Sequence, residues 1–146
     1  MIAIACDHGG FALKTVIKAY LTEQGYEVHD FGCDGLESCD YPDFGIPAAK
    51  AVADGSCEKG IVICTTGVGM SMAANKVHGV RCALCSDPLS ASLTRQHNDA
   101  NVLALGAGII GQNLALEIVS VFLHTAFQGG RHQRRVDKMM ALESAL

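Results

Sequence analysis

The sequence between residues 60 and 71 reads Gly60-Ile-Val-Ile-Cys64-Thr-Thr-Gly-Val-Gly-Met-Ser71. A short apolar run ends at Cys64 and passes directly into a Gly-rich turn, after which the sequence predicts a helix over residues 71–78. The run lacks polar alternation, which is typical of a strand buried on both faces of a parallel sheet. Met70 and Met72, beside the turn, are expected to fill the core. These residues therefore predict a strand, a tight turn and a helix, in that order.

The same pattern repeats along the chain. Strands are predicted at residues 2–6, 26–31, 60–64, 81–85 and 101–105. Amphipathic segments between and after them predict helices at residues 11–24, 46–54, 71–78, 88–97, 114–124 and 131–146. Alternating strands and helices are typical of an α/β fold, in which right-handed crossovers build a doubly wound parallel sheet. We therefore expect a single domain over residues 1–146.

The composition limits the class of protein. Of 146 residues, 49% are hydrophobic and 18% are charged, which excludes an intrinsically disordered chain. The formal net charge of −4 argues against a nucleic-acid binder, because such proteins need a dominant basic surface. No apolar run reaches the roughly 20 residues that span a membrane, and the first apolar run lacks the basic segment of a signal peptide. The seven Cys then indicate reduced thiols in a cytoplasmic protein.

Polar residues gather where the predicted strands meet the helices. Asp7 and His8 follow the first strand, and Cys64 with its Gly-rich turn follows the third. His97 ends the predicted helix 88–97, directly before the fifth strand. Ligands of open α/β sheets bind at the carboxyl ends of the strands. We therefore expect one polar, Gly-lined site at that edge, which contains both His, the Cys and the Asp.

Cys64 stands next to a helix N-terminus, where unpaired backbone N–H groups and a partial positive charge favour an anion. The amides of residues 67–71 are therefore suited to cradle an oxyanion or a phosphate, and the same field favours a reactive thiolate at Cys64. His8 and His97 suit proton transfer, with Asp7 to orient a His or to move a second proton. The plainer alternatives are a buried inert Cys and solvated surface His.

A basic segment opens the last predicted helix. Arg131 and Arg135 are four residues apart and share a helical face, so the pair is suited to clamp a phosphate. A solvated basic face is the alternative, and nucleic-acid binding is disfavoured because no aromatic residue interleaves the segment. Cys82 and Cys85 have the spacing of zinc ligands, but we expect them within a strand, where they point to opposite faces and form no metal site.

Five segments of the chain carry a family resemblance. They are Cys6-Asp-His-Gly-Gly, Asp40-Tyr-Pro-Asp-Phe, Cys64-Thr-Thr-Gly-Val-Gly-Met-Ser-Met-Ala-Ala-Asn-Lys, Arg95-Gln-His-Asn-Asp-Ala-Asn-Val-Leu-Ala-Leu-Gly and Gly129-Gly-Arg-His-Gln-Arg-Arg-Val. In this order and spacing they resemble the type B ribose-5-phosphate isomerases, whose family includes galactose-6-phosphate and allose-6-phosphate isomerases. The resemblance implies a Rossmann-like three-layer α/β/α subunit with a five-stranded, mostly parallel sheet, and an aldose–ketose isomerase without metal or other cofactor. It also implies a homodimer, in some members paired into a tetramer, with each active site built from two subunits.

The resemblance also assigns roles to residues of this chain. Cys64 would move the proton between carbons one and two of the sugar through an enediolate, and His97, supplied by the partner subunit, would open the sugar ring. The other roles fall to Thr66, Gly67 and Gly69 at the enediolate oxygen, to Ser71 at the end of the amide cradle, to Asp7 and Tyr41 at the sugar, to Asn98 at its hydroxyls, and to His8, Arg131 and Arg135 at the phosphate.

Two positions depart from the family pattern. Thr65 stands where the family usually has Gly, so a side chain there would crowd the oxyanion site or meet a backbone that needs a positive φ. Gly108 follows the fifth strand, where the family often has a phosphate-binding Arg. Residues 73–75 read Ala-Ala-Asn, without the Glu base of another branch of the family, so the chain resembles the Cys-dependent branch.

These observations predict interconversion of ribose-5-phosphate and ribulose-5-phosphate, a step of the pentose phosphate pathway. Isomerisation of a six-carbon sugar, allose-6-phosphate or galactose-6-phosphate, is a second hypothesis. A catalytically silent phosphosugar-binding module is a third. The presence of Cys64 and His97 in one chain favours the five-carbon substrate, whereas Thr65 and Gly108 are the features that would support the silent module.

Overall fold

The computed structural model describes residues 1–145, and residue 146, the last of the predicted helix 131–146, lies outside them. The strands are β1 (Ile2–Cys6), β2 (Val28–Asp30), β3 (Lys59–Cys64), β4 (Cys82–Leu84) and β5 (Val102–Gly106). The helices are the short 3₁₀ turn η1 (His8–Gly10), then α1 (Phe11–Glu23), α2 (Tyr41–Ala53), α3 (Val68–Asn75), α4 (Pro88–Asn98), α5 (Gln112–His124) and α6 (Arg131–Ala145). Within the described residues, no helix has the length and apolar character that a membrane span requires.

The five strands form one sheet in the order β2-β1-β3-β5-β4. Cys6 pairs with Ile63, and Cys64 pairs with Gly106, so β1, β3 and β5 end at one edge of the sheet. Every residue of β1 and β5 is buried, which explains their unbroken apolar runs. The α/β prediction is confirmed, and the sheet, expected to be mostly parallel, is parallel throughout residues 1–145.

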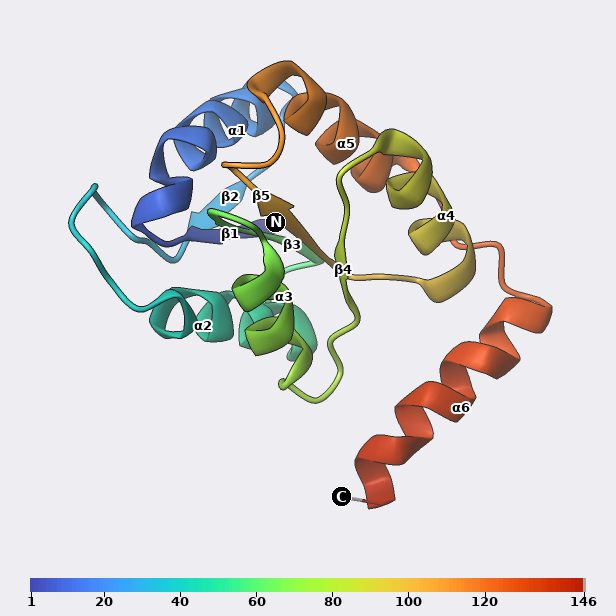
Figure 1. The fold of residues 1–146 in the computed structure, drawn as a ribbon. Coiled ribbons are helices and arrows are strands. Elements are labelled where there is room, and N and C mark those ends of the chain that lie inside the picture. Colours follow the sequence, from blue (N-terminus) through green and yellow to red (C-terminus); the bar gives the residue numbers. More distant parts are fainter. Residues whose placement is uncertain (146) are drawn as a thin grey trace.

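Helices cover both faces of this sheet and give the fold its three layers (Figure 1). On one face α1, α4 and α5 enclose a core that includes Ile4, Ile63 and Phe122. On the other face α2 and α3 enclose a second core, which includes Cys64 and Met70. Successive residues of a strand point to opposite faces, so Ile63 and Cys64 belong to different cores. Cys64 thereby faces the layer of α2 and α3.

Two helices begin at least three residues earlier than the sequence predicts. α2 begins at Tyr41 rather than at residue 46, because Pro42 in its first turn has a fixed φ that suits a helix start. α3 begins at Val68 rather than at residue 71, because Gly67 adopts a left-handed φ of 77° and completes the turn by itself. The loop after β3 is therefore shorter than expected.

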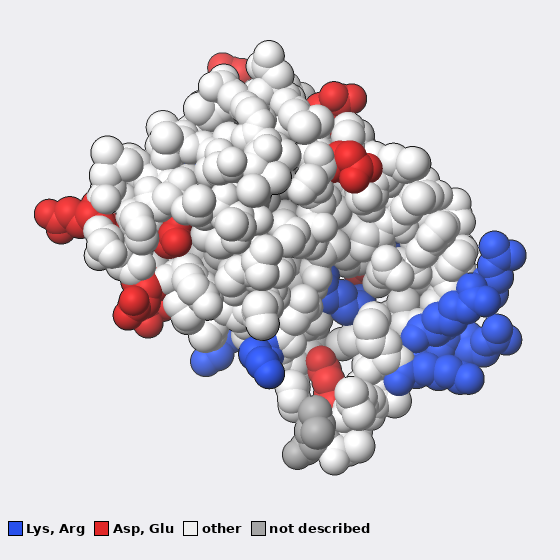
Figure 2. All heavy atoms as spheres, in the orientation of Figure 1, with Lys and Arg blue, Asp and Glu red and all other residues white. Residues whose placement is uncertain are grey.

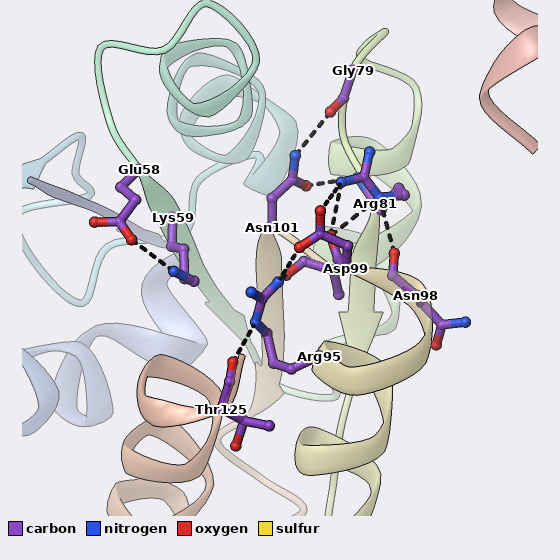
Figure 3. A network of polar contacts seen from close by, with 10 residues as sticks. Glu58, Lys59, Gly79, Arg81, Arg95, Asn98, Asp99, Asn101 and Thr125 are labelled. Atoms are coloured by element: carbon purple, nitrogen blue, oxygen red, sulfur yellow. Dashed lines mark hydrogen bonds and ion pairs between the residues drawn. The ribbon is translucent and has the colours of Figure 1, made fainter. Parts of the chain in front are cut away.

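α4 ends in a network of charged side chains at the amino end of β5 (Figure 3). Arg95 donates to the Asp99 carboxylate at 2.8 Å. Arg81, just before β4, donates to the carbonyl oxygens of Asn98 and Asp99 at 3.0 and 2.8 Å. Because β4 and β5 are parallel neighbours, α4 has to return from the carboxyl edge of the sheet to the amino edge. The network holds the end of α4 at that amino edge.

α6 projects from the three layers (Figure 1). It packs on α4, and near its C-terminal end the Glu143 carboxylate accepts hydrogen bonds from the Gly79 N–H at 2.9 and 3.0 Å. A cavity of about 610 Å³, whose lining includes Arg81, Met139 and Leu142, lies between α6 and the rest of the molecule. The helix begins at Arg131, as the sequence predicts.

A buried ion pair joins α1 to the end of β2. Lys14, with 3% of its side chain exposed, donates to the Asp30 carboxylate at 2.8 Å and to the Cys33 carbonyl oxygen at 2.5 Å. Lys18 reaches the other carboxylate oxygen from the solvent side at 3.1 Å. Burial raises the pKa of Asp30, but hydrogen bonds from Lys14, the Gly32 N–H and Lys18 outweigh it and hold that pKa below its ordinary value. Asp30 therefore supplies the counter-charge of a buried ammonium group.

Replacing Asp30 by Ala leaves the Lys14 ammonium buried without a counter-charge, which we expect to lower the unfolding free energy by about 3 kcal/mol. Lys18→Ala is the matched control, since it removes a half-exposed partner of the same carboxylate and should cost about 1 kcal/mol or less. Urea unfolding followed by circular dichroism measures both losses. Equal losses in the two variants would contradict the role of burial.

The ion pair also has a pH dependence of defined sign. Because the pKa of Asp30 is lowered in the folded state, its stabilisation is complete above the unfolded pKa of about 4. It is lost as the pH falls through the lower, folded pKa. The difference in stability between the parent protein and Asp30→Ala should therefore shrink on acidification.

Candidate active site

The turn between β3 and α3 brings a thiol to a helix N-terminus. Cys64 is the last residue of β3 and is 5% exposed. The backbone N–H of Gly67 donates to Cys64 Sγ at 3.1 Å. A Cβ on Gly67 would lie 2.5 Å from Leu84 Cδ1 and 2.8 Å from the Leu105 carbonyl carbon, so only Gly fits this position. The turn thus holds the thiol against a backbone donor, at the positive end of the α3 dipole.

The first turn of α3 offers a further backbone donor at Gly69. This is the second residue of the helix, so its N–H has no carbonyl partner within it. The Tyr41 ring packs over it, because a Cβ on Gly69 would lie 2.7 Å from Tyr41 Cζ. Thr66 Oγ1 accepts a hydrogen bond from the Val68 N–H at 3.2 Å, and the Ser71 hydroxyl donates to the Val68 carbonyl at 2.7 Å. Thr66 and Ser71 therefore shape the turn through local hydrogen bonds.

Asp7 and His8 hold the loop after β1 at the same edge of the sheet. Asp7 is 6% exposed and accepts hydrogen bonds from the N–H groups of Gly9 and Gly10 at 2.9 and 3.1 Å. His8 Nδ1 accepts a hydrogen bond from the Cys39 N–H at 3.2 Å. The neutral His8 ring therefore carries its proton on Nε2. Sequence reasoning missed Cys39, because a partner that acts through its backbone N–H has no side-chain signature.

Thr65 does not have the strained backbone that its replacement of Gly suggested. Among residues 1–145, Asp99 is the one residue other than Gly with a positive φ, so that expectation is wrong for Thr65. The Thr65 carbonyl accepts a hydrogen bond from the Gly108 N–H at 2.8 Å. Its Cγ2 is 3.0 Å from where a Cβ of Gly108 would stand, and a Cβ on Gly9 would overlap its hydroxyl oxygen. The side chain is therefore directed to the loops after β1 and β5.

The carboxyl edge of the sheet thus gathers most of the residues that the sequence singled out. The elements concerned are β1 and η1, the start of α2, and the β3–α3 turn. The residues brought together are Asp7, His8, Tyr41, Cys64, Thr66, Gly67, Gly69 and Ser71.

His97 does not lie at that edge, so the expectation of one site with both His is wrong for a single chain. A helix between two parallel strands runs antiparallel to them, and its last turn lies at the amino edge of the sheet. His97 is in the last turn of α4. The length of a five-residue strand, roughly 15 Å, separates this edge from Cys64.

A second cluster forms instead where α4 meets α6. His97, Asn98, Arg131 and Arg135 line a cavity of about 470 Å³. The His97 ring stacks on that of His132, with centroids 4.4 Å apart and 16° between the planes. Burial, together with the nearby charges of His97, Arg131 and Arg135, lowers the pKa of His132. The lowered pKa disfavours a charge on His132, and its ring supports the His97 ring from one face.

Three of the other thiols lie in surroundings that disfavour reaction. Burial raises the pKa of Cys6 and of Cys82 to about 12 and that of Cys85 to about 11, so these thiols stay protonated. Cys82 lies in β4 and Cys85 just beyond it, outside the strand that was expected to hold both. In the described part of the chain, no three His, Cys, Asp or Glu side chains are grouped so as to hold a metal ion.

Comparison with known proteins identifies the family. The model of a family described as Ribose/Galactose Isomerase matches residues 2–139. The chain is 51% identical to ribose-5-phosphate isomerase B of Escherichia coli (strain K12), over 97% of this chain and 95% of that protein. The structure of ribose-5-phosphate isomerase B from Clostridium thermocellum matches with a TM-score of 0.97 at 53% identity, over 99% of this chain and 97% of the other. The enzyme from Mycoplasma genitalium, solved with bound ribulose-5-phosphate, matches with a TM-score of 0.96 at 44% identity, over 99% and 97% of the two chains. The chain therefore belongs to the ribose/galactose isomerase family and is an isomerase.

Proposed function

We propose that the protein interconverts ribose-5-phosphate and ribulose-5-phosphate, with Cys64 as the base. The observation that carries this proposal is the Cys64 thiol at the N-terminus of α3, with the Gly67 N–H 3.1 Å from its sulfur. Relatives named ribose-5-phosphate isomerase B, which match over nearly the whole chain, support the substrate.

We also propose a cytoplasmic location. The seven free thiols support it, because such thiols persist in a reducing compartment.

The chemistry of the reaction explains why a base and backbone donors are needed together. From the aldose, the Cys64 thiolate takes the proton on carbon two, and that electron pair forms the double bond of an enediolate while the aldehyde oxygen gains the negative charge. The sulfur then returns the proton to carbon one, and the hydroxyl proton passes from the oxygen on carbon two to the oxygen on carbon one. The N–H of Gly69, at the positive end of α3, stabilises the negative oxygen. Thr66 and Asp7 assist proton movement between the two oxygens.

We also propose that the active site is shared between two copies of the chain. Ring opening needs a second acid–base group, and His97 is suited to it, but in one chain His97 lies at the opposite edge of the sheet from Cys64. A symmetric dimer places each residue of one copy against the matching surface of the other, so one contact completes two sites. Cys64 of one copy then faces His97 and Asn98 of the second.

An exposed apolar surface supports this dimer. It is formed by Val68 and Met72 of α3, Leu84 of the edge strand β4, and Leu89 and Leu93 of α4. Met72 is 63% exposed, so its expected place in the core is wrong, whereas Met70 is buried as predicted. Exposed apolar side chains and an open edge strand are features that a second chain covers. Val68 lies in the first turn of α3, next to the Cys64 loop, and Leu93 lies on α4, the helix that ends at His97 and Asn98.

The phosphate binds, we propose, to His8 of one copy and to Arg131 and Arg135 of the other. Figure 2 shows Lys and Arg side chains gathered on the side of the molecule where α6 lies, and both Arg are exposed. His8 offers its Nε2–H from the loop after β1. Two guanidinium groups and one imidazole would bind the phosphate dianion through charge-assisted hydrogen bonds.

Purified protein should convert ribose-5-phosphate to ribulose-5-phosphate in the presence of a chelator, because no step in the proposed reaction needs a metal. Allose-6-phosphate and galactose-6-phosphate, assayed in parallel, separate the five-carbon hypothesis from the six-carbon one. A silent module would be recognised by thermal stabilisation with ribose-5-phosphate in the absence of any product.

Replacing Cys64 by Ala removes the base and should lower kcat by about 10³-fold or more. Binding of ribose-5-phosphate, measured by calorimetry, should persist. Cys57→Ala is the matched control, since Cys57 is also a buried thiol of the α2–α3 core and should leave kcat within about twofold. Full turnover by Cys64→Ala would rule out the sulfur as the base.

Two inactive variants should complement each other if the site is shared. Cys64→Ala and His97→Asn are mixed under conditions that exchange subunits, so that half of the dimers contain one of each. Each mixed dimer has one intact site, and we expect about a quarter of the parent activity. A mixture of Cys64→Ala with the double variant is the control and should stay inactive. A first mixture that is no more active than its components would exclude a site made from both copies.

A further inference from the structure

We propose that Thr65 determines specificity, because its side chain limits the length of the phosphosugar that the Cys64 site accepts. This inference depends on the proposed function, since it concerns the choice among substrates of the same site. Thr65 is exposed and directly follows Cys64 at the carboxyl edge of the sheet. The Thr65 side chain faces the loop that carries Asp7 and His8, so a sugar that reaches from the Cys64 sulfur to His8 would pass beside it.

The Thr65 side chain occupies space between the two loops that flank β3. A Cβ on Gly9 would overlap the Thr65 hydroxyl oxygen, and a Cβ on Gly108 would lie 3.0 Å from Thr65 Cγ2. The two branches of the side chain therefore face the two loops, one each. Gly9 and Gly108 are the residues that leave room for it. Thr65 and Gly108 are thus in direct contact.

Thr65 is also fixed in place, so it acts as a wall rather than as a mobile side chain. A β-branched side chain has a stiff χ1, and rotation would drive one branch toward the backbone of a neighbouring loop. The Thr65 carbonyl is held by the Gly108 N–H at 2.8 Å, which restrains the backbone as well. A substrate cannot displace this wall without opening the contact between the β3 and β5 loops.

The Thr65 side chain lies beside the path that the sugar takes from the reacting carbons to the phosphate. A Cβ on Gly9 would also lie 3.3 Å from Asp7 Oδ1, so the Thr65 hydroxyl and the Asp7 carboxylate converge on the same point. This point lies beside His8, which we place at the phosphate. The carbons between the reacting end and the phosphate must fit along this path. A Thr side chain has about the bulk of one hydroxymethylene unit, by which a six-carbon sugar exceeds a five-carbon one.

Thr65→Gly, Thr65→Val and Thr65→Ser test the proposal. For each we compare kcat/KM for allose-6-phosphate and ribose-5-phosphate, and the two dissociation constants by calorimetry in a Cys64→Ala background, which prevents turnover. Thr65→Gly should raise the six-carbon to five-carbon ratio about tenfold or more, the usual discrimination for one carbon unit. Thr65→Val keeps the β-branched shape and removes only the hydroxyl, so it should leave the ratio within about twofold if bulk is what selects. Thr65→Ser removes only the methyl group and should give a smaller shift in the same direction as Gly.

The outcomes separate this proposal from the proposed function. An unchanged ratio in Thr65→Gly overturns the wall, and so does a Val variant that shifts as far as the Gly variant, because the hydroxyl would then be the selecting group. If Thr65→Gly fails to fold, judged by its melting temperature, the direction of the Thr65→Ser shift decides. If the parent protein turns over neither sugar, the proposed function fails, whereas the ratio of dissociation constants still supports or overturns the role of Thr65.

Discussion

The left-handed conformation of Gly67 is the constraint on which the site depends. With φ at 77°, the chain turns within three residues of the end of β3, and α3 begins at Val68. The Gly67 N–H then reaches Cys64 Sγ, and the unpaired N–H of Gly69 follows in the first turn. A side chain at residue 67 would strike Leu105, so the turn could not lie this close to β5. One backbone conformation therefore provides both the donor to the sulfur and the N–H that we propose for the oxyanion.

Close backbone approach is the general building principle at this edge. A Cβ on Gly106 would lie 2.5 Å from the Thr66 carbonyl oxygen, and one on Gly10 would lie 2.6 Å from the Ile63 carbonyl oxygen. The loops after β1, β3 and β5 thus pack backbone against backbone. A site bounded by main-chain atoms changes little when surrounding side chains move, which suits donors that must be preorganised. Thr65 differs, because its side chain lies between Gly9 and Gly108 of the two neighbouring loops.

Local signals made the centre of the fold predictable from sequence. The apolar run ending at Cys64 and the glycines after it specify a strand and a turn without help from distant residues. The early start of α2 comes from Pro42 in its first turn, whereas the amphipathic pattern that predicts this helix begins only at residue 46. The exposure of Met72 could not be predicted from the sequence. An apolar residue at helical spacing gives the same pattern whether it packs in the core of its own chain or against a second chain. The prediction for His97 was wrong for a different reason. A helix between two parallel strands ends at the amino edge of the sheet, so the predicted alternation of strands and helices already implies that His97, at the end of α4, lies there.

The proposed dimer couples assembly to catalysis through a single helix. α3 begins at the turn that holds Cys64 and, four residues beyond Val68, presents Met72 to the proposed interface. The same helix therefore carries the amide donors and part of the surface that brings His97 of the second copy. Proton transfer and ring opening both need the reacting groups to be positioned to a fraction of an ångström. A looser fit at the interface would therefore lower the reaction rate before it weakened association. In the proposed dimer, packing at Met72, Leu84 and Leu89 would therefore affect the rate of the reaction as well as the association of the two copies.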